Sequence, residues 1–291
     1  MKLDYNIKEL IKKYAALIET NNFNQLYSDI ENNYQLLGYL PELTRVLESA
    51  KIYPLDYMTY IPAEMYCESE ASEIKIPNNI ERIHRNAFLS AHAETITMKD
   101  NVRYLGNNCF YDCKQLTNIE LSNNLEVIPK YCFKDCIKLE SIKLPTTCIV
   151  IDFGAFANCE KLRVIDFNDQ LSTIGSNAFL GTGLRIIRIP SSVKTIENGA
   201  FSYCDQLEKV VIPGNTKIKS ECFSDCDQLR EVSLGKDVEL IGGFNFSDCS
   251  NLESITYLGT KKQFIGKNLP RNWFGGSSIE VVRCTDGDIK L

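Results

Sequence analysis

A phenylalanine recurs at nearly constant intervals through most of this 291-residue chain. Successive positions are 22 or 23 residues apart: Phe88, Phe110, Phe133, Phe156, Phe179, Phe201, Phe223 and Phe246. The same residue types return at fixed offsets around each Phe. A period of this length, held over most of a chain, is typical of a solenoid, in which each repeat packs mainly against its neighbours.

Further apolar columns accompany the Phe column. Isoleucine or leucine stands five residues before each Phe: Ile83, Leu105, Ile128, Ile151, Ile174, Ile196, Ile218 and Ile241. The position eight before is also apolar, except at Asn215. Leucine stands six after most of them: Leu116, Leu139, Leu162, Leu207, Leu229 and Leu252. The segment that follows, as in Ile142-Lys143-Leu144, alternates apolar and polar residues as a β-strand does. Stacked repeats would then form one parallel sheet.

The repeat varies at two places. Met65 lies 23 residues before Phe88 and predicts a degenerate first repeat. The repeat that begins at Phe179 is one residue short and contains Gly181 and Gly183, which allow a tighter turn.

Residues 1–56 differ from the repeat and show apolar residues at helical spacing. We expect a small helical N-terminal cap there, covering the open end of a solenoid at residues 57–257, with a C-terminal cap at 258–291. A separate docking module at residues 1–56 is the alternative.

The pattern Ala-Phe-x-x-Cys-x-x-Leu-x-x-Ile-x-Leu-Pro resembles the BspA-like leucine-rich repeat over residues 60–257. That family occurs in bacterial surface proteins and in many phage and protist proteins. The resemblance implies an α/β-type repeat solenoid, a curved leucine-rich repeat with one parallel β-sheet. The tail from Tyr257 to Asp288 also resembles the closing segment of such proteins.

Twelve cysteines invite a metal or disulfide interpretation, which the columns argue against. Six of them stand three residues after a Phe: Cys113, Cys136, Cys159, Cys204, Cys226 and Cys249. Cys109, Cys132 and Cys222 stand one before a Phe, where other repeats have alanine, so this position requires only a small side chain. Buried free cysteine behaves as a small hydrophobe. Cys67 and Cys284 lie outside the columns and are the expected exposed thiols.

The chain offers little for catalysis or cofactors. It has two histidines, His84 and His92, and of these only His92 could approach Cys113 on the next turn. Asp286 and Asp288 are too few oxygen ligands for calcium and more simply mark a closing turn. We therefore expect no catalytic residues, no metal and no cofactor.

Charge and hydropathy exclude other classes. The formal net charge of −6 argues against a nucleic-acid binder, and no apolar run is long enough for a membrane span. The N-terminus has no secretory signal pattern. We expect a cytoplasmic protein, with association with a virion as an alternative.

Strand residues that alternate with the buried ones should face outward on the concave side. They place Glu120, Lys143, Asp166 and Arg188 in a row of alternating charge, so neighbours could pair across strands. Val164, Ile186 and Val211 should lie together in the middle, with Lys209 beside them.

These eight residues are the candidate protein-binding site, because exposed apolar centres ringed by charge suit protein contacts. A solvated strand surface with no partner is the alternative. The sequence predicts a non-enzymatic protein–protein interaction module. The second hypothesis is a structural spacer or assembly component, for example of a phage particle, with contacts at its ends.

Overall fold

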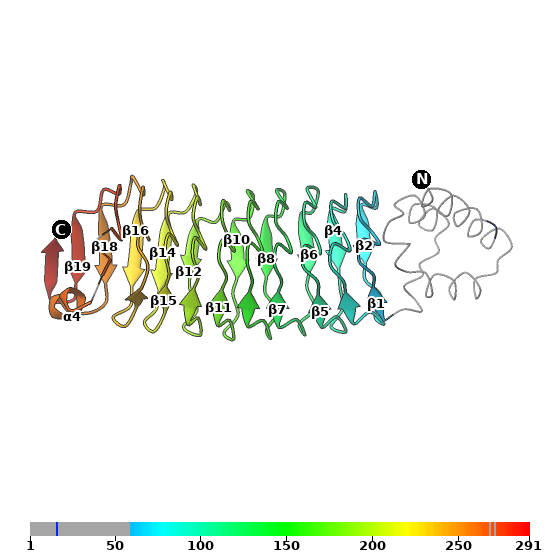
Figure 1. The fold of residues 1–291 in the computed structure, drawn as a ribbon, viewed down its shortest axis with the longest axis horizontal. Helices are drawn as coiled ribbons and strands as arrows, with labels where there is room; N and C mark the ends of the chain where they lie inside the picture. Colours follow the sequence, from blue (N-terminus) through cyan, green and yellow to red (C-terminus); the bar gives the residue numbers. More distant parts are fainter. Residues whose placement is uncertain (1–15, 17–58, 268, 271) are drawn as a thin grey trace, which may run out of the picture.

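The computed structural model describes residues 16, 59–267, 269–270 and 272–291. In these ranges the chain winds into coils that stack side by side along the long axis of Figure 1. The row of coils is nearly straight in that view. Apart from residue 16, the helical cap predicted for residues 1–56 lies outside the described residues.

Each coil has two short strands rather than the single strand that the sequence predicts. The longer strands form one row: β2 (Glu73–Lys75), β4 (Thr95–Thr97), β6 (Asn118–Glu120), β8 (Ser141–Lys143), β10 (Val164–Asp166), β12 (Ile186–Arg188), β14 (Lys209–Ile212), β16 (Glu231–Leu234) and β18 (Ser254–Tyr257). Two-residue strands form the other: β1 (Tyr60–Ile61), β3 (Arg82–Ile83), β5 (Tyr104–Leu105), β7 (Val127–Ile128), β9 (Val150–Ile151), β11 (Thr173–Ile174), β13 (Thr195–Ile196), β15 (Lys217–Ile218) and β17 (Glu239–Leu240). In the described residues from 59 onward the only helix is α4 (Lys261–Ile265), so this part of the chain is a parallel β-solenoid, and the predicted α/β class is not confirmed.

The two rows of strands are interrupted, so the prediction of one continuous parallel sheet is wrong. The longer strands pair in three groups: β2, β4 and β6; β8 and β10; and β12, β14, β16 and β18. The last group continues into β19 (Val281–Cys284) and β20 (Gly287–Lys290). The two-residue strands pair in two groups: β1, β3 and β5; and β7, β9, β11, β13, β15 and β17. Both rows are therefore unpaired between the coil of β5 and β6 and the coil of β7 and β8.

The Phe residues stack inside the turn that joins each longer strand to the two-residue strand before it. The rings of Phe133 and Phe156 are 5.2 Å apart at 8°, and the whole column repeats this geometry. Tyr66 extends the stack at 5.1 Å from Phe88. The first repeat is therefore built on Tyr66 and not on Met65, one residue away, because Tyr66 supplies the ring.

Two left-handed residues bracket each Phe and turn the chain around it. The residues two before have positive φ: Asn86, Asn108, Tyr131, Gly154, Asn177, Gly199, Glu221 and Phe244. The residues two after do as well: Ser90, Asp112, Asp135, Asn158, Gly181, Tyr203, Asp225 and Asp248. Most are Asn, Asp or Gly, the residues that adopt this conformation most easily.

The apolar columns fill the interior, with two corrections. Leu240 and not Ile241 belongs to the column, because Leu240 pairs with Ile218 and Ile241 is 54% exposed. The extra residue of that repeat lies between the strand and Phe246. Where Asn215 breaks the other column, Thr216 is buried instead and its Oγ1 donates to the Val193 carbonyl at 3.2 Å.

The C-terminal segment covers the last coil. Trp273 is buried and meets Phe246 edge-on at 6.1 Å, which ends the ring stack. Thr260 caps α4. The first backbone N–H of the helix, that of Lys261, donates to Asp286 Oδ1 at 2.7 Å. Asp286 thus holds the β19–β20 turn against the helix.

Candidate functional site: the long-strand face

The long-strand face is the surface formed by the outward side chains of β2, β4, β6, β8, β10, β12, β14, β16 and β18. In β6, β8 and β12 the first and third residues are exposed and the middle one is buried, as alternation predicts. The candidate residues all lie on this face, exposed or half-buried: Glu120, Lys143, Val164, Asp166, Ile186, Arg188, Lys209 and Val211.

The apolar centre is more divided than the sequence predicts. Val164 is 59% exposed and Ile186 is 52% exposed. They stand on β10 and β12, which are neighbouring strands that do not pair. Val211 is half-buried and lies opposite Arg188, further along the strand direction. Val164 and Ile186 are therefore the main exposed apolar contacts of this face.

The predicted row of charge pairs does not form. Lys143 lies opposite Asp166, but none of Glu120, Lys143, Asp166 and Arg188 has an ion-pair partner within 4.0 Å in the described part of the chain. The reason is partly the interrupted sheet, because the Glu120–Lys143 and Asp166–Arg188 pairs would each cross a break.

Ion pairs form instead on the uninterrupted strands beyond. Arg185 Nε donates to Glu208 Oε1 at 3.0 Å, and Lys209 pairs with Glu231. Among the described residues, Lys209 is thus the one candidate charge that already has an ion-pair partner.

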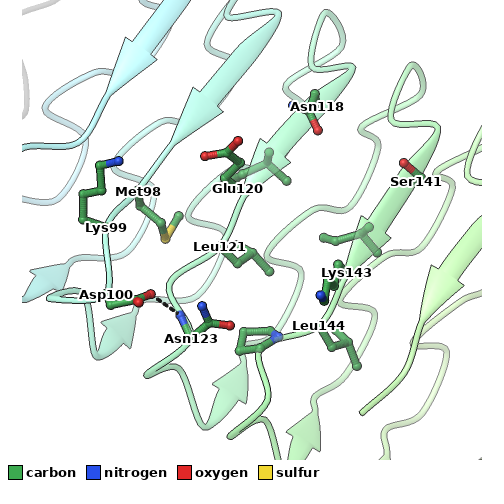
Figure 2. A pocket seen from close by; sticks show the side chains of 13 residues that line it. Met98, Lys99, Asp100, Asn118, Glu120, Leu121, Asn123, Ser141, Lys143 and Leu144 are labelled. Carbon is green, nitrogen blue, oxygen red and sulfur yellow. Dashed lines mark hydrogen bonds between the residues drawn. The ribbon is translucent and has the colours of Figure 1, made fainter.

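A polar groove of about 470 Å³ lies at the first break, between β6 and β8 (Figure 2). Leu121 is half-buried in it, with Glu120 on one side and Lys143 on the other. The Asn123 amide donates to Asp100 Oδ1 at 2.8 Å, which ties the loop after β6 to the loop after β4. In other coils the backbone N–H just after the longer strand donates to the next coil, as that of Leu144 does. The backbone N–H of Leu121 makes no such bond to β8.

A second groove of about 410 Å³ lies at the other break, between β10 and β12. Ile165 and Phe167 are half-buried there, whereas Ile142 and Leu144, at the same positions of the preceding coil, are buried. Asp166, Ile186 and Arg188 stand around the opening. Neither groove is predicted from the sequence, although the short repeat at Phe179 lies beside the second.

The cysteines serve the interior of the turns. Each Cys three after a Phe donates its thiol to the carbonyl of a Phe in the preceding coil; Cys136 reaches Phe110 at 3.1 Å and Cys159 reaches Phe133 at 3.0 Å. Burial raises the pKa of Cys148 to about 11 and that of Cys222 to about 12, so these thiols stay protonated at neutral pH. Among the described residues, no His, Cys, Asp and Glu side chains are grouped to hold a metal ion.

The two thiols outside the columns are less exposed than predicted. Cys67 and Cys284 are both half-buried. Burial, with Glu68 and Glu64 nearby, raises the pKa of Cys67 to about 11, which makes it a poor nucleophile.

The histidines do not meet a thiol. His92 Nδ1 lies 2.7 Å from Glu70 Oε2, while the Cys113 thiol donates to the Phe88 carbonyl. His92 and Cys113 therefore each contact another group and do not pair with each other. Partial burial, with Arg82 nearby, lowers the pKa of His84.

No helix in the described ranges is long and apolar enough to cross a bilayer.

Comparison with known proteins agrees with this architecture. A leucine-rich repeat protein from Bacteroides ovatus is 26% identical with a TM-score of 0.61, covering 69% of this chain and 58% of its own. The T. pallidum Leucine Rich Repeat protein is 26% identical with a TM-score of 0.51, covering 54% of this chain and 78% of its own. This chain thus spans 58% of the Bacteroides ovatus protein. A search among curated proteins found no match.

A model of the BspA type leucine rich repeat region matches residues 59–184 and 150–280. The matches span most of the chain and include every stacked Phe. The chain therefore belongs to the BspA type leucine-rich repeat family.

Proposed function

We propose that this chain is a non-enzymatic interaction module that binds a protein partner through the long-strand face, centred on β10, β12 and β14. The observation on which the proposal rests is the exposure of Val164 and Ile186, at 59% and 52%, on neighbouring strands. Single exposed apolar residues are ordinary, but two exposed β-branched residues on neighbouring strands, with charged residues around them, are typical of a protein contact. Membership of a leucine-rich repeat family supports this function.

The charges around the patch favour recognition. Lys143, Asp166 and Arg188 have no ion-pair partner within the described residues, so they can pair with a partner without first breaking an internal bond. Such charges increase specificity and association rate more than affinity.

The test uses the full chain in three forms, namely wild type, Ile186→Glu and Ile241→Glu. It compares which proteins of the native host each form captures. Ile186→Glu places a charge in the patch, where any complex would desolvate it without a designed partner. Ile241→Glu is the matched control, because Ile241 is equally exposed (54%) but follows β17 in the other row. A partner lost only with Ile186→Glu supports the proposal. If both variants keep every partner, the structural spacer with contacts at its ends becomes the better account.

A further inference from the structure

We infer that the groove between β10 and β12 holds a peptide segment of the partner, with one apolar side chain in the groove between an acidic and a basic neighbour. This rests on the proposed function and specifies its ligand.

The groove lies beside the short turn from Phe179 to Leu184. Gly183 passes so close to the preceding coil that a Cβ there would lie 2.3 Å from the Glu160 carbonyl oxygen. On the opposite row, β9, β11 and β13 still pair in register, through Thr173 with Val150 and Thr195. The two coils therefore separate only on the long-strand face.

The groove has partly uncovered apolar residues among its polar and charged lining. Ile165 is the one middle residue of the nine longer strands that is not fully buried. Phe167 is half-buried, and its ring meets Phe179 edge-on at 6.1 Å and 86°. An apolar side chain that enters the groove would remove both residues from water, which favours binding in proportion to the area covered.

The charges stand on opposite sides of the groove. Asp166 ends β10 and Arg188 ends β12, both exposed, and they form no ion pair with each other. Asp169 adds a second carboxylate among the lining residues. A basic residue of the peptide would pair with Asp166, and an acidic one would accept hydrogen bonds from Arg188.

The experiment selects peptides from a random phage-displayed library on the full chain and measures binding of an enriched peptide by calorimetry. We expect enriched sequences with one apolar residue between an acid and a base. Arg188→Ala should weaken binding roughly tenfold or more, as for a charged hydrogen bond. Arg283→Ala is the matched control: Arg283 is exposed on β19, in the same column of the same sheet, and far from the groove.

A charge exchange sharpens the result. The double variant Asp166→Arg with Arg188→Asp should lose the peptide and regain binding when the acid and base of the peptide are exchanged. If Ile186→Glu abolishes binding but the Arg188 variant and the exchange have no effect, the face binds and the groove inference is overturned. If no such sequences are enriched, or if Ile186→Glu binds them normally, the groove inference is likewise overturned, and in the latter case the proposed face is as well.

An independent observation concerns the boundary at which both rows are unpaired. In most other described coils the residue four before the Phe donates its N–H to the coil before it, as Gly106 does to Ile83 at 2.7 Å and Asp152 to Ile128 at 2.9 Å; in the coil of Phe246, Ile241, five before, does so instead. Pro129 occupies this position and has no N–H. Across this boundary the coils remain joined at the turns, where the Phe110 amide donates to the Cys132 carbonyl at 2.9 Å.

We infer that this boundary is a joint that divides the solenoid into two units, which open separately. In a repeat array the interface between neighbours determines cooperativity, so one weak interface separates two cooperative blocks. The first block would contain β1–β6 and the second β7–β20.

Hydrogen–deuterium exchange with peptide-level mass spectrometry tests the joint. In the full chain we expect a step in protection between residues 105 and 130, with uniform protection on either side. Pro129→Ala restores the N–H and should shrink the step. Pro213→Ala, a proline in a loop after β14, should leave it unchanged. A smooth gradient from the ends, or an equal effect of both variants, would overturn the inference.

Discussion

The turn side of the solenoid is continuous, whereas the long-strand face is interrupted twice. On the turn side the rings stack from Tyr66 to Phe246 with centroids 5.1–5.5 Å apart. On the other side β6 and β8, and β10 and β12, lie next to each other without pairing. The difference indicates that stability depends chiefly on the turns, which leaves the long-strand face free to vary and to form grooves.

The contrast has a simple physical basis. A ring such as Phe156 contacts a ring on both sides, so replacing it leaves a cavity that two neighbours share. An outward residue such as Ile186 contacts mainly solvent. The comparison can be tested by perturbing each side separately.

The largest expected effect comes from alkaline pH acting on the turn side. Burial raises the pKa of several thiols above that of an unfolded thiol: Cys109, Cys132, Cys136, Cys148, Cys159, Cys222 and Cys226. A raised folded pKa stabilises the fold below the unfolded pKa, and this stability is lost as pH rises toward the folded value. Each thiol should therefore cost up to about 1.4 kcal/mol per pH unit above roughly pH 8.5. Urea unfolding at pH 8, 9 and 10 measures the slope.

A triple variant provides the control for that prediction. Cys109, Cys132 and Cys222 occupy the column where other repeats have alanine, so alanine should be tolerated there. Replacing all three should reduce the slope in proportion. A free energy of unfolding that does not change between pH 8 and pH 10 would contradict the account.

The next largest effect should come from breaking the ring stack. Phe156→Ala should cost about 3–5 kcal/mol, because it removes a fully buried ring between two others. Val164→Ala on the long-strand face should stay within about 0.5 kcal/mol, since Val164 is 59% exposed. Urea unfolding compares the two, and similar costs would mean that the stack does not dominate stability.

The smallest effect should come from the ion pair between Lys209 and Glu231 on the long-strand face. A double-mutant cycle with alanine should give a coupling below about 1 kcal/mol that shrinks with added salt, because both side chains contact solvent. A coupling of several kcal/mol would show that this face contributes to stability as the turns do.

The sequence predicts the turn side better than the long-strand face, because the turn side is continuous and the long-strand face is interrupted. Phe133 recurs with its neighbours at fixed offsets because every coil needs the same buried ring. Two column assignments are wrong by one residue, because a neighbouring apolar residue fits the pattern as well: Tyr66 and not Met65 supplies the ring, and Leu240 and not Ile241 is buried. The exposed positions of Val164 and Ile186 followed from alternation alone.

The breaks in the sheet were not predicted, because they depend on how coils meet. Pro129 gives a readable signal, since it has no N–H and follows another coil; Pro62, at the same position before Tyr66, lies in the first coil of the described solenoid. The short repeat at Phe179 is visible in the sequence. The close approach of Gly183 to Glu160, beside β10 and β12, is seen only in the structure. Two of the missing charge pairs, Glu120–Lys143 and Asp166–Arg188, follow from the same breaks.

Two neighbouring isoleucines test most directly whether the long-strand face is free while the interior holds the fold. Ile186 is 52% exposed and Ile187 is 1% exposed. In urea unfolding, Ile186→Glu should change the free energy of unfolding by no more than about 1 kcal/mol, as surface substitutions usually do. Ile187→Glu should cost more than about 4 kcal/mol or prevent folding, because it buries an unpaired charge. Equal losses, or a larger loss for Ile186→Glu, would place the wrong residues on the face and contradict the account.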